Sequence, residues 1–98
     1  PLADHVLKQI IGLKLRSIGK RVRESYGVNF EVDAAVTDAI VERCREVESG
    51  ARNIENILNR TLLPELSAGV LGRLAEGRPI TQVRVGLNSE GGFSYDLG

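Results

Sequence analysis

The residues whose types and spacing most clearly suggest a binding function are Ser-Gly-Ala-Arg at 49–52, which open a long helical pattern. Gly50 lets the chain turn without a Cβ clash. The first amides of a helix have no partner inside the helix and favour an anion. Arg52 opposes the helix dipole there, which is understandable if its guanidinium binds a phosphate. From these residues alone, an ordinary surface arginine after a glycine break is the simpler interpretation.

Two other side chains could do chemistry. His5 lies in the first turn of a predicted helix, without a cysteine or a second histidine, so we predict no metal site there. Cys44 is the only cysteine, which excludes a disulfide within the chain. It lies on the apolar side of a predicted helix with no histidine nearby in the sequence. We therefore predict a buried structural thiol rather than a nucleophile.

Basic residues gather on one face of the first predicted helix. They are Lys8, Lys14, Arg16, Lys20, Arg21 and Arg23. The whole chain has 13 basic and 13 acidic residues, so it has no general attraction to nucleic acid or to an anionic membrane. We interpret this face as solvated, with a contact to a neighbouring subunit or a nucleotide as the alternative. Tyr26 and Tyr95 are expected to pack at strand ends.

The composition is that of one globular domain, residues 1–98, with 42% hydrophobic and 27% charged residues. Without Trp or Met, its core must be built mostly from Leu, Ile and Val. No apolar run reaches the roughly 18–20 residues of a membrane helix, and no signal-peptide pattern opens the chain. Because Pro1 stands where an initiator Met would be, we expect the chain to be a fragment of a larger protein.

Hydrophobic periodicity predicts the first three elements. Apolar residues recur at steps of three or four over 4–24, which predicts a helix that ends with Gly27 as a left-handed C-cap. Its inward stripe is Leu7, Ile11, Leu15, Ile18 and Val22, widened by Val6, Ile10 and Leu13. Alternation predicts a strand over 28–32. Asp33 is a good N-cap for a second helix to about Glu48. Its inward residues are Ala35, Val36, Ala39, Ile40, Cys44 and Val47.

A third helical pattern runs over 51–76 and is closed by Gly77. Its stripe is Ile54, Leu58, Leu62, Leu66, Val70 and Leu74. Ile57, Leu63 and Leu71 lie off this line, so we expect the exposed apolar residues to come from that set. Pro64 removes a hydrogen bond to the carbonyl of Arg60, which predicts a kink or a break.

The last segment reads as a hairpin, with alternating strands over 83–87 and 93–97 and turn residues over 88–92. The strand at 28–32 should pair with 83–87 in parallel, because the two-helix connection allows a right-handed crossover. The predicted fold class is α+β. Three helices pack on a small three-stranded sheet, in the order helix, strand, helix, helix, strand, strand.

Gly-Ala-Arg at 50–52, placed between a helix–strand–helix unit and a two-strand end, resembles a known motif. It is similar to the sensor-two motif of the C-terminal small, or lid, domain of Clp/ClpB-type AAA+ unfoldases. The resemblance covers the whole chain. Segments 47–54 and 57–67 look most like ClpV, the unfoldase of bacterial type VI secretion. ClpB and ClpA members follow the motif with a Pro-Leu-basic pattern, whereas this chain has Asn-Ile-Glu at 53–55, a departure that favours ClpV.

The resemblance implies a role for each residue of the motif. Arg52 would contact the γ-phosphate of ATP, which is bound with magnesium on a preceding large domain, and Gly50 and Ala51 would support the helix start. The chain would be the lid of a second AAA+ module in a cytoplasmic bacterial homohexamer. It would pack against the large domain of its own chain and that of the neighbouring subunit, in a motor acting on type VI sheath subunits. A general ClpB/ClpA-type disaggregase or unfoldase is the alternative within the family.

The chain alone lacks the parts of an ATPase: it has no Gly-x-x-x-x-Gly-Lys-Ser/Thr loop and no acidic strand end for magnesium. We expect the fragment to bind no cofactor and hydrolyse no ATP, although the full-length protein should be an ATPase. A stand-alone adaptor or nucleic-acid-binding module is the rival from another class. The second predicted helix argues against a recognition helix, because it carries Asp33, Asp38, Glu42, Glu46 and Glu48.

Overall fold

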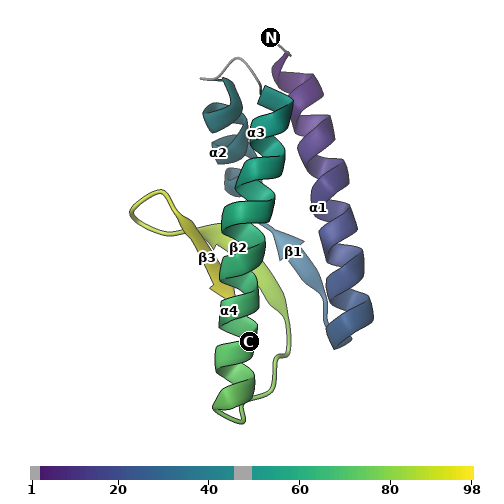
Figure 1. The fold of residues 1–98 in the computed structure, drawn as a ribbon, viewed down its shortest axis with the longest axis vertical. Coiled ribbons are helices and arrows are strands. Elements are labelled where there is room, and N and C mark those ends of the chain that lie inside the picture. The colour runs from purple at the N-terminus through teal and green to yellow at the C-terminus, as the bar shows by residue number, and fades with distance from the viewer. Residues whose placement is uncertain (1–2, 46–49) are drawn as a thin grey trace.

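The computed structural model describes residues 3–45 and 50–98, and its elements follow the predicted order. They are α1 (Asp4–Tyr26), β1 (Phe30–Val32), α2 (Ala34–Arg45), α3 (Gly50–Ile57), the π-helical turn η1 (Leu58–Leu62), α4 (Leu63–Ala75), β2 (Val83–Leu87) and β3 (Phe93–Asp96). α3, η1 and α4 follow one another along a single rod that lies beside α1 and the sheet (Figure 1). The predicted α+β class is confirmed.

The sheet has the strand order β1–β2–β3, with β1 parallel to β2 and β2 antiparallel to β3. Phe30 stands opposite Val83, so the predicted parallel pair is confirmed. The strand begins at Phe30 rather than at Val28 as predicted. The backbone pairing nevertheless reaches one residue further, because the N–H of Val83 donates to the carbonyl of Asn29 at 2.9 Å.

The hairpin turn between β2 and β3 is held by the side chain of Asn88. Its Oδ1 accepts hydrogen bonds from the N–H groups of Glu90 and Gly92, each at 2.9 Å. Asparagine favours such turns because its side chain can satisfy backbone groups that the strands leave unpaired. The turn residues predicted from sequence therefore fix the register of the last two strands.

α1 buries the predicted stripe of Leu7, Ile11, Leu15, Ile18 and Val22. Gly27 caps it in the left-handed conformation, with φ 67°, and its N–H donates to the carbonyl of Arg23 at 2.9 Å. Leu13, predicted to widen the stripe, is instead 63% exposed. It lies about 200° around the helix from Ile11, so it faces away from the core.

α2 begins directly after Asp33, whose carboxylate accepts a hydrogen bond from the Nε of Arg84 at 3.0 Å. The helix buries Val36, Ile40, Val41 and Cys44. The inward orientation predicted for Ala35 is wrong, because this residue is exposed, about 100° around the helix from Val36. The predicted continuation to Glu48, which includes Val47, lies outside the described residues.

The spacing of the core residues along the rod does not fit a regular α-helix. Ile54, Leu58, Leu62, Leu66 and Val70 are all buried and are four residues apart. In an α-helix a step of four residues turns about 400°, so such a stripe drifts by about 40° per step and about 160° over four steps. A regular helix would therefore turn Val70 away from the surface that buries Ile54.

η1 removes most of this drift. The N–H of Leu63 donates to the carbonyl of Leu58, five residues back instead of four, so the turn holds one extra residue. One extra residue offsets about 100° of rotation. Pro64 follows directly and has no N–H to donate to Arg60, so the α-helical pattern is interrupted where the sequence predicted a break.

Two predictions along the rod are wrong, one on each side of η1. Leu74, predicted to lie in the stripe, is 57% exposed, because the drift returns in the regular helix α4 and Leu74 lies about 80° around from Leu66. Ile57, predicted to lie among the exposed residues, is buried, because it lies only about 60° around α3 from Ile54. Leu71 is 65% exposed, as predicted, and Leu63 is half-buried.

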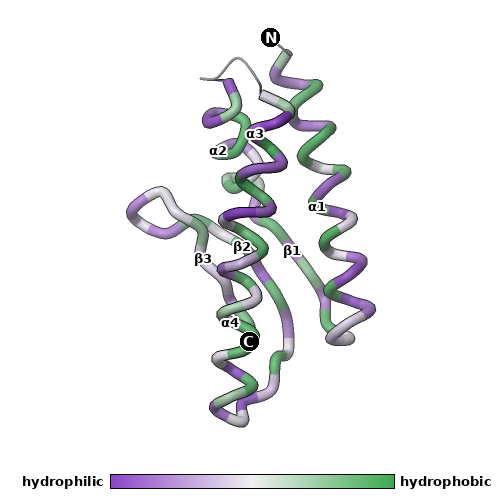
Figure 2. The backbone as a smooth tube through the Cα atoms, viewed as in Figure 1, coloured by the Kyte–Doolittle hydropathy of each residue, from purple (hydrophilic) through white to green (hydrophobic). Residues whose placement is uncertain are grey.

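One core cluster joins the helices to the sheet. β2 contributes Val83 and Val85 to this cluster, and β3 contributes Phe93. The hydrophobic residues recur between hydrophilic ones along α1 and the rod (Figure 2). Within residues 3–45 and 50–98, no polar or charged residue is fully buried. The domain is therefore held together by apolar burial, the dominant favourable term in folding.

Leu62→Ala should lower the free energy of unfolding by about 2–4 kcal/mol, because Leu62 is fully buried. Leu71→Ala removes the same atoms from an exposed position and should change it by less than about 0.5 kcal/mol. Urea denaturation followed by circular dichroism measures both variants. Equal losses would show that Leu62 does not face the core.

Candidate functional site

The predicted phosphate-contacting segment lies where the rod begins, beside the N-terminal end of α1 (Figure 1). A Cβ on Gly50 would lie 3.2 Å from the carbonyl oxygen of Cys44 and 3.5 Å from Cδ2 of Leu7. The first of these contacts is tighter than side chains normally make, so glycine lets α3 start close to the end of α2. Ser49 lies outside the described residues.

Arg52 is held on the outer side of α3. Ile54 lies about 200° around the helix from it and is fully buried. Asn53 fixes the same rotation, because its Nδ2 donates to the carbonyl of Arg43 at 3.4 Å. Arg52 is consequently exposed, as is Ala51 before it.

No carboxylate of the described residues forms an ion pair with Arg52. Elsewhere in the described residues, six other cations do pair with carboxylates: Lys8, Lys14, Lys20, Arg45, Arg78 and Arg84. A guanidinium in the first turn of a helix opposes the dipole, and a bound anion would relieve this opposition. The arrangement can therefore stabilise an anion through one exposed cation and the first amides of α3, which have no partner inside the helix.

The other two side chains singled out in the sequence are Cys44 and His5. Cys44 is buried, as predicted, and burial raises the pKa of its thiol. His5 is exposed. No group of three or more His, Cys, Asp or Glu residues that could hold a metal ion occurs in the part of the chain that the structure describes.

A cluster of ion pairs joins the first turn of α1 to the last turn of α2. Nε of Arg45 donates to Asp4 at 3.2 Å, and its Nη1 donates to Glu42 at 3.0 Å. The hydrogen bond with Asp4 is the main reason that the pKa of Arg45 is raised. This cluster could not be predicted from the sequence, because 41 positions separate Asp4 from Arg45 and no local pattern links them.

The basic face of α1 is only partly free. Lys8 pairs with Asp38 at 3.4 Å, and Lys14 pairs with Glu55 of α3. The hydrogen bond from Lys14 is the main reason that the pKa of Glu55 is lowered. The interpretation of the whole face as solvated is therefore incomplete, because Lys14 ties α1 to the rod.

The two tyrosines differ from each other. Tyr26 is 45% exposed at the end of α1, so its predicted strand-end packing is wrong. Tyr95 lies in β3 and is half-buried, and its hydroxyl donates to Oε1 of Glu65 at 2.8 Å. Burial, and then the bond to Glu65, raise the pKa of Tyr95 well above its usual range.

Comparison with known proteins identifies the class. The family described as the C-terminal, D2-small domain, of ClpB protein matches residues 2–85. The chain is 47% identical over 97 residues to the AAA+ ATPase ClpV1 of Pseudomonas aeruginosa, which covers 99% of this chain and 11% of that protein. It is 30% identical over 71 residues to the Chaperone protein ClpB of Yersinia enterocolitica, which covers 72% of this chain and 8% of that protein.

These matches define a domain of ClpB/ClpV-type AAA+ proteins, which the sequence resemblance had indicated. The chain belongs to the family of C-terminal D2-small domains of ClpB. It spans about a tenth of the length of the curated relatives that it matches. Among the described residues, no helix is both long and apolar enough to cross a membrane.

The thiol of Cys44 should react with iodoacetamide at pH 8 at least about a hundredfold more slowly in the folded domain than in urea. Burial blocks access and favours the unreactive thiol over the thiolate, so reaction requires local opening. Mass spectrometry of the alkylated chain gives both rates. Similar rates in the two conditions would contradict the buried position.

Proposed function

We propose that this domain is the nucleotide-sensing lid of a ClpV-type unfoldase, in which Arg52 contacts the γ-phosphate of ATP on the large ATPase domain. The observation that carries the proposal is the exposed guanidinium of Arg52 at the start of α3, which pairs with no carboxylate of the described residues. It occurs in a chain that is 47% identical to ClpV1 over 99% of its own length.

The residues present fit one part of an ATP site. Arg52 supplies a planar fork of donors suited to a terminal phosphate, while Gly50 lets the helix that carries it start close to the end of α2 and the exposed Ala51 adds only a methyl group. ATP with magnesium supplies the phosphoanhydride bond that the large domain would cleave. The contribution of this chain is to bind the terminal phosphate and to place a fixed positive charge beside it.

This contact would couple the orientation of the lid to the nucleotide state. A ligand shifts a conformational equilibrium only through contacts that differ between the two states, and the γ-phosphate is present in ATP and absent from ADP. A displacement of Arg52 and α3 would be transmitted to α1 and α2 through ion pairs between the helices. Lys14–Glu55 ties α3 to α1, and Asp4–Arg45 ties α1 to the end of α2.

The proposal includes the assembly and the substrate of the full-length protein. As part of a homohexamer in the bacterial cytoplasm, the domain would contact the large domain of the neighbouring subunit through a heterologous interface, which closes a ring. Exposed apolar residues such as Leu13, Leu71 and Leu74 offer surface for such contacts. The substrate would be the subunits of the contracted type VI sheath.

A general disaggregase is the second candidate, because the matching family is described from ClpB and the chain is 30% identical to a ClpB chaperone. The two candidates share the role of Arg52 and differ in substrate. The full-length protein should disassemble contracted sheaths if it is a ClpV-type motor and should recover heat-aggregated proteins if it is a ClpB-type one. The adaptor and nucleic-acid alternatives gain no support from the family match.

In the full-length protein, Arg52→Ala should lower ATP turnover by roughly 10²–10³, the usual loss for a donor that stabilises charge at a reacting centre. The melting temperature should stay unchanged, because Arg52 is exposed. Arg52→Lys should restore turnover only in part, since an ammonium lacks the bidentate fork. Steady-state ATPase rates and thermal melts measure all three effects.

Arg60→Ala is the matched control, since Arg60 is exposed on the same rod and forms no ion pair with a carboxylate of residues 3–45 or 50–98. Arg73 is unsuitable, because its Nη2 donates to the carbonyl of Pro79 at 2.7 Å. Equal, small losses of turnover for Arg52→Ala and Arg60→Ala would refute the sensing role.

A further inference from the structure

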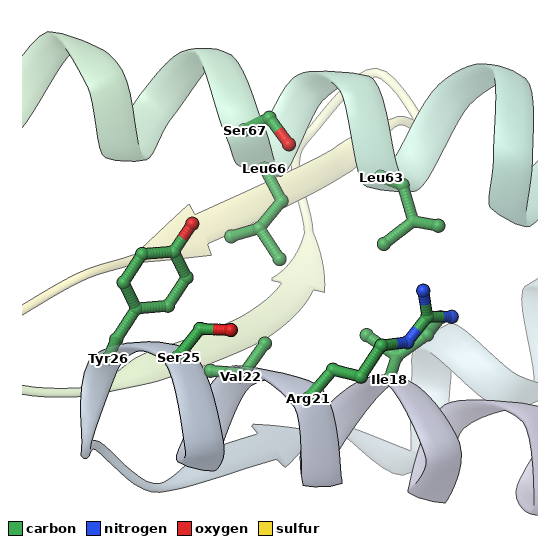
Figure 3. A pocket seen from close by; sticks show the side chains of 8 residues that line it. All are labelled: Ile18, Arg21, Val22, Ser25, Tyr26, Leu63, Leu66 and Ser67. Carbon is green, nitrogen blue, oxygen red and sulfur yellow. The ribbon is translucent and has the colours of Figure 1, made fainter.

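A groove runs along the seam between α1 and the rod. Its floor is apolar, since Leu63 and Leu66 of the rod point toward Ile18 and Val22 of α1, and Tyr26 closes one end (Figure 3). The hollow measures about 130 Å³. A dry cavity of about 150 Å³ holds a benzene molecule, so this hollow could take one apolar side chain.

A second hollow of about 110 Å³ extends the groove toward the N-terminal end of α1. It shares Ile18, Arg21 and Leu63 with the first hollow and adds polar residues, among them Lys14 and Glu55. The two hollows together follow the seam from Lys14 to Tyr26. Twelve steps along a helix span about 18 Å, a little over three helical turns.

The charges that line the groove do not balance. Lys14 and Glu55 pair with each other, which leaves Arg21 as the remaining charge of the lining. Arg21 is exposed and forms no ion pair with a carboxylate in the part of the chain that the structure describes. Its guanidinium lies over the groove near Leu63 (Figure 3). A partner that brings a carboxylate would complement this cation.

We propose that this groove binds a protein segment in which an apolar side chain stands within one helical turn of an aspartate or a glutamate. The apolar side chain would fill the hollow between α1 and the rod, and the carboxylate would pair with Arg21. An amphipathic helix laid along the seam is the arrangement that presents both groups on one face.

The identity of the protein that supplies this segment rests on the proposed function. The curated relatives are roughly nine to twelve times as long as the lengths matched here, so the same ATPase offers many segments outside this domain. We place the segment in a neighbouring copy, because the ring proposed above brings that copy against this domain. Arg52 does not line the groove, and the residues changed in the test, Arg21 and Tyr26, lie in the C-terminal part of α1, whereas α3 starts beside its N-terminal end. The two roles can therefore be tested independently.

Site-specific photocrosslinking tests the occupant. The photoreactive amino acid p-benzoylphenylalanine replaces Tyr26 in the full-length protein, and the crosslinked peptides are identified by mass spectrometry after irradiation with ATP present. The expected partner peptide comes from outside residues 1–98 of the same protein and carries an acidic residue within about four positions of the crosslinked one. When isotopically labelled and unlabelled copies are mixed, we expect crosslinks that join the two, and crosslinks only within one copy would overturn the proposal.

Arg21→Glu should lower the crosslinking yield by at least about fivefold, because it places like charges together, and Arg21→Lys should retain most of the yield. Arg16→Glu makes the same charge change at another exposed site on α1 and should have no effect. A thermal melt of each variant excludes misfolding as the cause of a loss. An Arg21→Glu yield equal to that of Arg16→Glu, or crosslinks only to another protein, would overturn the proposal. The same holds if a probe at the exposed Gln9 gives an equal yield.

Discussion

The four-residue spacing of buried side chains along the rod is the constraint on which the rest of the domain depends. Ile54 and Val70 can face the same core only if the helix between them takes up an extra residue, and η1 does so. The turn thereby sets the rotation of both ends of the rod. It leaves Arg52 outside the core at one end and Leu71 and Leu74 outside it at the other.

The sheet supports the rod at this turn. The hydroxyl of Tyr95 lies 3.3 Å from the carbonyl oxygen of Leu62 and 2.8 Å from Oε1 of Glu65, on either side of Pro64. The single O–H proton of Tyr95 is donated to Glu65, and this bond links β3 to the first turn of α4. β3 therefore connects to the rod at the place where the regular helix is interrupted.

The sequence predicts well whatever depends on local pattern. Parallel pairing of β1 with β2 follows from the length of the two-helix connection, and the hairpin turn follows from the chemistry of Asn88 and the glycines after it. The position of the break follows from Pro64, but its form does not, because a proline allows a kink, a break or a π turn. The exposure of Leu74 depends on that form and was consequently predicted wrongly.

The candidate site shows the same division. The position of Arg52 at a helix start can be read from Gly50 and the pattern after it, and the structure places it there, exposed. The link from Asp4 to Arg45 and the groove beside Arg21 depend on residues brought together from distant parts of the chain. No local spacing signals such contacts, so only the folded arrangement of α1, α2 and the rod reveals them.

The most direct measurement for the central claim is a cryo-electron microscopy structure of the full-length protein, bound to a slowly hydrolysed ATP analogue. We predict that the guanidinium of Arg52 lies at hydrogen-bond distance, about 2.7–2.9 Å, from oxygens of the γ-phosphate. We also predict that this contact is absent in the ADP state. Density that places Arg52 in solvent, away from the nucleotide in both states, would contradict the account.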